Sequence, residues 1–283
     1  MFIAMLSTTD FLDTIRLCLR SGVRPVDVIS KSIRDVLHTA VGSFSHSTFQ
    51  TVDAEDTVYE MCKSLQQFGN DFVPIIDSSA DDGSLVATLG YCDIVNLMFQ
   101  AAAQHPHLFQ ERIESLKCRA QLSSALKSSP RSSFSGSPSK ASRTSESIPL
   151  PTVTVPRTTL LGDVLNLMCA KELSGVPVVD DNNRVIGIYH KEDLSFISSA
   201  TPDAIEVIMN GSLSLQIGEI VKHQTDDSST VPHKLCTCTV RDTIKEVLDT
   251  MLSRRVTRVV CIDDDGRCTS MISIADIVWY FFD

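Results

Sequence analysis

The fold is decided by the stretch TVTVPRTTLLGDVLNLMCAKELSGVPVVDDNNRVIGIYHKEDLSFI, residues 152–197, and by its second version, CTCTVRDTIKEVLDTMLSRRVTRVVCIDDDGRCTSMISIADIVWYFF, residues 236–282. Each opens with a short β-branched run and continues with apolar residues at helical spacing. Two further apolar runs and a second helical pattern follow. Each stretch therefore predicts a strand, a helix, two strands and a second helix.

The first helix of residues 152–197 shows the pattern most clearly. Its predicted apolar face consists of Leu160, Leu161, Val164, Leu165 and Met168. We expect this face to pack on the strands, with Thr158 or Thr159 as the N-cap. The clusters at 181–183 and 264–266 are turn-forming, so in each stretch they predict a hairpin between the two strands that they connect.

Four aspartates in matching contexts extend the pattern over most of the chain. Asp10 and Asp93 lie 83 residues apart, as do Asp193 and Asp276. Each follows an apolar run and begins a helical pattern, a position where a single Asp usually only caps the helix. Four in register indicate a repeated unit instead. In the second unit we expect strands at 48–52, 71–77 and 84–90 and a helix at 56–68.

The spacing divides the chain into four repeats and three linkers. The first repeat shows only its last strand and helix, so we expect it to be truncated, whether by fragmentation, by an isoform or by a gene-model error. The predicted parts are the truncated repeat 1–20, a linker helix in 21–48, repeat 49–110, a Ser-rich linker 111–150, repeat 151–200, a linker 201–235 and repeat 236–283.

The linkers carry two open questions. Residues 123–147 are serine-rich and lack apolar periodicity, which predicts a disordered link between two compact bodies, each built from one pair of repeats. This link is either a solvated spacer or a site of phosphorylation, at Ser132, at Ser133 or at the Ser129-Pro130 and Ser137-Pro138 steps. The helix expected at 26–41 either packs on its own domain or contacts a partner.

Composition excludes several classes of function. The net charge of -10 disfavours nucleic-acid partners, and no run of about 18 to 20 apolar residues suggests a membrane span. Nine scattered cysteines favour a reducing compartment, the cytoplasm first and the nucleus second. Neither a phosphate loop nor a nucleophile elbow is present, so we expect no enzyme activity. Cys236 and Cys238 lack a second ligand pair, and no metal site is expected.

The motifs GVPVVD, IGIY and ISIADI resemble cystathionine-β-synthase (CBS) repeats. The tandem of four resembles the gamma subunits of AMP-activated, or SNF1-type, protein kinases. That resemblance implies an α/β (α+β) fold in which paired repeats form two Bateman modules. It also implies a regulatory, energy-sensing subunit without cofactors that binds AMP, ADP and ATP. The implied partners are a kinase catalytic (alpha) subunit and a beta scaffold, in a heterotrimer.

The resemblance also assigns roles to individual residues. A ribose-binding role falls on the four aspartates, Asp10, Asp93, Asp193 and Asp276, joined by Met5, Ser7 and Ser273 on the strand ends before them. Phosphate-binding roles fall on Lys191 and on Arg258, which follows Thr257. Ser174 and Gly175 would line the third pocket.

The chain departs from the family where a His-Arg pair is usual. The second repeat has Asp71-Phe72 at that place and the fourth has Thr257-Arg258. We therefore expect the fourth-repeat pocket, with Asp276, Ser273, Arg258 and Lys191, to be the strongest and the second the weakest. Two alternatives remain. One is a degenerate interaction subunit that binds nucleotide weakly or not at all, and the other is a CBS module for another adenosyl ligand.

Overall fold

The structure is a computed structural model. It describes residues 24, 27, 32, 51–68, 72–79, 84–102, 106–116, 152–171, 173–193, 211, 213–222 and 235–282. The predictions for the first repeat and the serine-rich link 123–147 lie outside these residues. Of the predicted helix 26–41, only Asp27, which is helical, and Ser32 are described.

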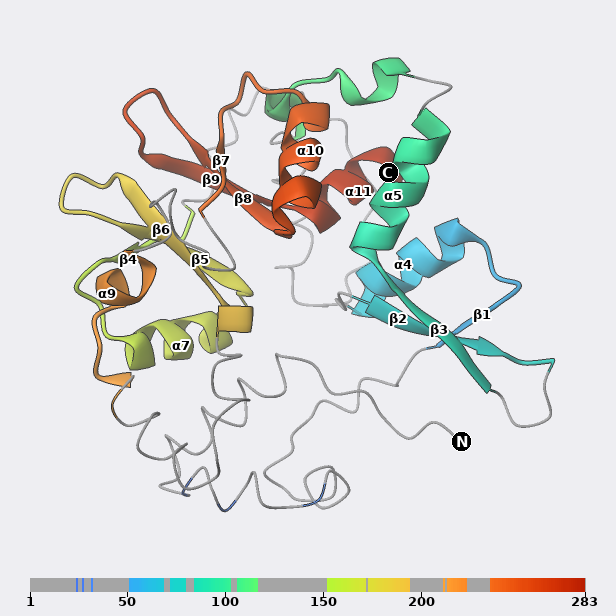
Figure 1. The fold of residues 1–283 in the computed structure, drawn as a ribbon, viewed down its shortest axis with the longest axis horizontal. Coiled ribbons are helices and arrows are strands. Elements are labelled where there is room, and N and C mark those ends of the chain that lie inside the picture. The colour runs from blue at the N-terminus through green and yellow to red at the C-terminus, as the bar shows by residue number, and fades with distance from the viewer. Residues whose placement is uncertain are drawn as a thin grey trace, which may run out of the picture.

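The second, third and fourth repeats each contain one three-stranded sheet, in the orders β1-β2-β3, β4-β5-β6 and β7-β8-β9 (Figure 1). In every sheet the short first strand runs parallel to the central strand, which pairs antiparallel with the third. The strands are β1 Val52–Asp53, β2 Phe72–Asp77, β3 Ser84–Gly90, β4 Val155–Pro156, β5 Gly175–Val179, β6 Val185–His190, β7 Thr237–Cys238, β8 Arg258–Ile262 and β9 Cys268–Ser273.

Helices precede and follow the central hairpin of the second and fourth repeats, and one helix is described in the third. The described helices are α4 Val58–Phe68, α5 Tyr91–Ala102, η1 Pro106–Phe109, α7 Leu161–Ala170, α9 Ile217–Val221, α10 Ile244–Arg254 and α11 Ile274–Phe282. The α/β class is confirmed, and so is the order of elements in the second and fourth repeats; the second helix predicted for the third repeat lies outside the described residues. The first strand of the second repeat is shorter and later than the expected 48–52, and its helix begins at 58 rather than 56.

The predicted hairpins of the third and fourth repeats are confirmed, and one aspartate organises each turn. Oδ1 of Asp180 accepts hydrogen bonds from the backbone N–H groups of Asn182 and Arg184, at 2.9 and 2.8 Å. Asp263 does the same for residues 265 and 267. Asn183 and Gly266 have φ values of 62° and 79°, which Gly and Asn adopt most easily.

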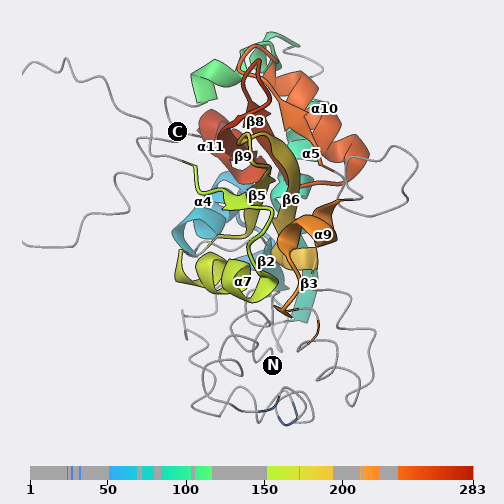
Figure 2. The ribbon, with the colours of Figure 1, turned by 90° about the vertical axis from the view of Figure 1, so that its left-hand side faces the viewer.

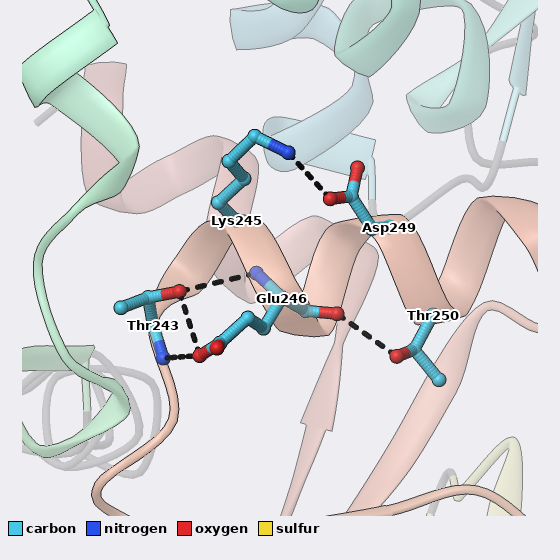
Figure 3. A network of polar contacts seen from close by, with 5 residues as sticks. All are labelled: Thr243, Lys245, Glu246, Asp249 and Thr250. Carbon is cyan, nitrogen blue, oxygen red and sulfur yellow. Dashed lines mark hydrogen bonds and ion pairs between the residues drawn. The ribbon is translucent and has the colours of Figure 1, made fainter.

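Helix α10 begins with a complete capping box (Figure 3). The Thr243 N–H donates to Oε2 of Glu246 at 2.8 Å, and the Glu246 N–H donates to Oγ1 of Thr243 at 3.2 Å. Thr57 and Glu60 form the same box at α4. These contacts satisfy backbone donors that the helix itself leaves without acceptors.

The N-cap predicted for the third repeat is wrong. Neither Thr158 nor Thr159 caps α7, since the N-cap is Leu160, which has no side-chain cap hydrogen bond. The chain between the third and fourth repeats supplies a backbone partner instead, because the Leu161 N–H donates to the Leu215 carbonyl at 2.9 Å. Tertiary pairing therefore replaces the local cap.

The segment that precedes the third repeat pairs with the fourth repeat, and the segment that precedes the fourth pairs with the third. Ile113, ahead of the third repeat, donates its N–H to Asp242 at the start of α10. Ile217, ahead of the fourth, donates its N–H to Thr159 at the start of α7. Accordingly, α9 lies beside β5 and β6 (Figures 1 and 2). Residues 111–116 and 213–222, expected to be linker, are thus integral parts of the fold.

Two hydrophobic clusters hold the described residues together. One lies within the third repeat and includes Leu165, Tyr189 and Ile217. The other is shared by the second and fourth repeats, where α5 packs on α11. Trp279 donates its Nε1–H to the Tyr91 hydroxyl at 3.3 Å across this contact. Helices from both halves of the chain therefore share one core.

Thr243→Ala is expected to destabilise the protein by about 1 kcal/mol, because it removes the capping hydroxyl. Hydrogen bonds from the backbone N–H and then the hydroxyl of Thr243 lower the pKa of Glu246. The box therefore stabilises the fold above the unfolded-state pKa, and this contribution disappears as pH falls through the lowered folded-state pKa. In thermal melting, the difference in melting temperature between wild type and Thr243→Ala should become smaller at acid pH. Thr57→Ala is the matched variant, and a gap independent of pH would contradict the assignment.

Candidate functional site

The three described repeat aspartates have the same geometry at the turn that follows the third strand. Oδ2 of Asp93, Asp193 and Asp276 accepts the backbone N–H three residues earlier, at 2.9, 2.7 and 2.8 Å respectively. Each carboxylate thus caps the turn that follows its strand. The shared contact fixes the carboxylates at equivalent places in the three repeats.

The fourth repeat brings four predicted residues together. Arg258 is the register partner of Ser273 on the neighbouring strand, and the Ile274 N–H donates to the Thr257 carbonyl at 2.9 Å. Ser273 also donates its hydroxyl to Oδ2 of Asp276 at 2.6 Å. Among the described residues, Oδ1 of Asp276 has no hydrogen-bond partner, so one carboxylate oxygen remains available to an outside donor.

The third repeat has the same arrangement with different side chains. Gly175 is the register partner of His190, and the Lys191 N–H donates to the Ser174 carbonyl at 3.0 Å. Lys191 is only 9% exposed, low for a lysine, and His190 is 3% exposed. A side chain at Gly175 would meet the His190 ring, because a Cβ there would lie 3.1 Å from Nδ1. Ser174, Gly175 and Lys191 therefore lie together beside His190, and their role in lining a pocket stays a prediction.

The second repeat offers less polar chemistry. Gly90 occupies the place of Ser273 and supplies only its backbone N–H to Asp93, which is exposed. Phe72 opposes Gly90 on the neighbouring strand, where the fourth repeat has Arg258. The predicted weakness of this pocket stays a prediction, and Asp71 lies outside the described residues.

The remaining predicted residues are placed as follows. Met5, Ser7 and Asp10 lie outside the described residues. Lys191 was expected to serve the fourth-repeat pocket, whereas its backbone contact is with Ser174 of its own repeat. Its reach toward Asp276 stays a prediction.

Sequence reasoning missed His190 and Tyr189. His190 occupies the register position of Ser273 and Gly90, so an alignment of the repeats on their aspartates would have found it. Tyr189 occupies the place of Leu89 and Ile272, which are purely apolar. The third repeat therefore differs from the others in its polar groups as well as in its helix cap.

Tyr189 carries a buried hydroxyl that has no hydrogen-bond partner among the residues that the structure describes. The residue is 1% exposed and belongs to the third-repeat core. Burial raises the pKa of Tyr189 far above its usual range, and the negative charge of Asp193 raises that pKa further. The hydroxyl therefore stays neutral and contributes a desolvation cost to folding.

Tyr189→Phe is expected to stabilise the protein by about 1 kcal/mol, because it removes that unpartnered hydroxyl and keeps the ring. Urea denaturation measures the change. Tyr280→Phe is the control with the opposite sign, since the Tyr280 hydroxyl donates to Glu111. A loss of stability in Tyr189→Phe would show that the hydroxyl is satisfied in solution.

The described residues also bear on other classes of site. No group of three or more His, Cys, Asp or Glu side chains among them is placed to hold a metal ion. Within the same residues, no helix has the length and apolar character needed to cross a membrane. The turn of the fourth repeat presents a fixed carboxylate beside the hydroxyl of Ser273 and the strand that carries Arg258, which suits a ligand with hydroxyl donors and an anionic end.

Comparison with known proteins locates the same repeats. The CBS domain family model matches residues 146–199 and 230–283, which overlie the third and fourth repeats. The chain is 29% identical over 129 residues to the 5'-AMP-activated protein kinase subunit gamma of Dictyostelium discoideum, covering 45% of this chain and 21% of that protein. It is also 29% identical over 123 residues to the subunit of the same name from Saccharomyces cerevisiae, covering 44% and 35%.

The chain thus spans about a fifth to a third of the length of these curated relatives. Among solved structures, a protein of Methanocaldococcus jannaschii superposes with a TM-score of 0.67 at 14% identity, covering 98% of this chain and 82% of that one. At such low identity this likeness concerns the fold alone. It agrees with the repeated sheets and helices described above.

Proposed function

We propose that this chain, whose residues 146–199 and 230–283 match the CBS domain family model, is a non-catalytic, gamma-type regulatory subunit of an AMP-activated or SNF1-type protein kinase. Its ligands are AMP, ADP and ATP, bound between repeats, and it needs no cofactor. Its partners are a kinase catalytic (alpha) subunit and a beta scaffold, and it acts in the cytoplasm and the nucleus. Nucleic acid and membranes are not among its partners.

One observation carries the nucleotide proposal. Asp276 is held by Ser273 through Oδ2, while Oδ1 has no partner among the described residues. A ribose offers hydroxyl donors to such an oxygen, and a carboxylate accepts them more strongly than a neutral group. Arg258, paired in register with Ser273, supplies positive charge for the phosphate end. A nucleoside phosphate therefore matches both ends of the fourth-repeat cluster.

Regulation would follow from differential affinity. A nucleotide changes the kinase only if it binds one arrangement of the assembly more tightly than another. AMP, ADP and ATP differ in charge and length at the phosphate end. The residues that meet the phosphates, Arg258 and Lys191, therefore decide which nucleotide favours which arrangement.

Two measurements test the proposal. Calorimetric titration of the purified chain with AMP and ATP should give saturable heats, and background heats for both nucleotides would end the sensor proposal. Affinity purification from native cells should recover a Ser/Thr kinase catalytic subunit. Binding without such a kinase would instead favour a free-standing module for an adenosyl ligand.

A second candidate is a degenerate interaction subunit that keeps the fold and binds nucleotide weakly or not at all. It is favoured by the capping contacts, since Oδ2 of all three described aspartates is already engaged with the backbone. In that case the carboxylates only finish the strand-to-helix turns. Kinase recovery without nucleotide heats identifies this outcome.

A further inference from the structure

The fourth repeat places two thiols opposite each other on neighbouring strands. Cys238 on β7 and Cys261 on β8 are register partners in the parallel pair. The equivalent pairs are Val52 with Ile75 in the second repeat and Val155 with Val178 in the third. Register partners in a sheet project their side chains to the same face, with strands about 4.8 Å apart. Disulfides form across Cα separations of about 4.4–6.8 Å, so this pair is within range.

We propose that Cys238 and Cys261 form a reversible disulfide when the protein meets a low-molecular-weight disulfide such as oxidised glutathione. Both cysteines are reduced in the structure. This inference does not depend on nucleotide binding. A cytosolic disulfide of this kind is typically transient and redox-sensing rather than structural.

The chemistry balances with glutathione disulfide as the oxidant. One cysteine thiolate attacks a sulfur of the reagent and releases one glutathione thiolate, leaving a mixed disulfide. The second cysteine thiolate attacks the protein sulfur of that mixed disulfide and releases the other glutathione. Two electrons pass from the cysteines to the reagent, and the two thiol protons end on the released glutathione.

Access to the pair comes from the edge of the sheet. Cys238 and Cys261 are 5% and 0% exposed, so attack requires local opening. Strand β7 has only two residues and lies at the edge of the order β7-β8-β9. Few hydrogen bonds hold such a strand, and short edge elements open locally at lower cost than central ones. Cys238 is therefore the first thiol that the reagent reaches.

The bond would restrain a strand that carries part of the fourth-repeat site. It joins β7 to β8 and closes the chain segment that contains α10. Strand β8 begins at Arg258, beside Thr257, so oxidation restrains the strand that carries these two residues. A disulfide also reduces the conformational freedom of the unfolded chain. It therefore raises the melting temperature when the bond forms without straining the native structure.

The test uses the full chain with oxidised glutathione, followed by alkylation and mass spectrometry. The expected result is the loss of two hydrogen atoms, a linked peptide containing Cys238 and Cys261, reversal by dithiothreitol and a melting temperature raised by several degrees. Cys238→Val and Cys261→Val should each abolish the link. Both should fold, because valine stands at the equivalent positions of the third repeat.

Cys236→Thr is the matched control and should keep the link, since residue 236 is not the register partner of Cys261. Two outcomes overturn the proposal. One is mixed-disulfide formation only at exposed Cys92, with Cys238 and Cys261 recovered as alkylated thiols. The other is a link made through Cys236.

Discussion

Asp276→Asn is expected to weaken AMP binding about 10- to 100-fold while leaving the melting temperature close to that of wild type. The variant loses a hydrogen bond to a charged acceptor, worth about 1.5 to 3 kcal/mol. An asparagine still offers one oxygen to the Ser273 N–H and hydroxyl, which Oδ2 of Asp276 accepts at 2.8 and 2.6 Å. Its amide group then faces the ligand, where the carboxylate presented an acceptor. Calorimetric titration measures the affinity.

A nucleotide analogue provides a sharper control for the role of the ribose hydroxyls. Wild type should bind AMP more tightly than an analogue without the ribose hydroxyls, whereas Asp276→Asn should no longer distinguish the two. Asp163→Asn changes an exposed carboxylate in the first turn of α7, far from this cluster in the sequence, and should leave affinity unchanged. If Asp276→Asn binds AMP as wild type does but melts lower, the aspartate is only a cap.

The capping contact explains why sequence alone identified the position better than its purpose. The recurrence of Asp93, Asp193 and Asp276 follows from local chemistry, because a carboxylate at this place satisfies backbone donors in every repeat. The strand and helix pattern was predictable for the same reason, since apolar periodicity and turn residues act over short distances. The sequence could not show what the second carboxylate oxygen contacts, because that depends on which groups lie near the turn in the folded protein.

Long-range contacts account for the errors. Thr159 is a good capping residue, yet Leu160 is the N-cap of α7 because the chain near Leu215 pairs with that turn. The apolar periodicity of residues 213–222 does not predict that these residues pair with the third repeat. The shared core was equally hidden from sequence, because the apolar face of α11 is compatible with a partner in its own half of the chain. Only the three-dimensional packing places α5 against it.

Leu248→Ala is expected to destabilise the protein by about 2–5 kcal/mol and to loosen the second repeat as well as the fourth. Leu248 is fully buried on α10 and belongs to the core that both repeats share. The cavity removes contacts from a cluster that also holds Leu65 of α4 and Ile94 of α5. Hydrogen exchange should therefore rise in α4 and α5, although neither helix is near residue 248 in the sequence.

Leu165→Ala provides the matched comparison, since Leu165 holds the equivalent helical position in the third repeat and is 2% exposed. Its neighbours belong to the separate third-repeat cluster, so a similar loss of stability should raise exchange in β5 and β6 and spare α4 and α5. Equal responses of α4 and α5 to the two variants would mean that all repeats unfold as one unit. Unchanged hydrogen exchange in α4 and α5 on Leu248→Ala would mean that the second and fourth repeats do not share their core in solution. A ligand at Asp276 would then have no continuous set of packed side chains through which to affect the second repeat.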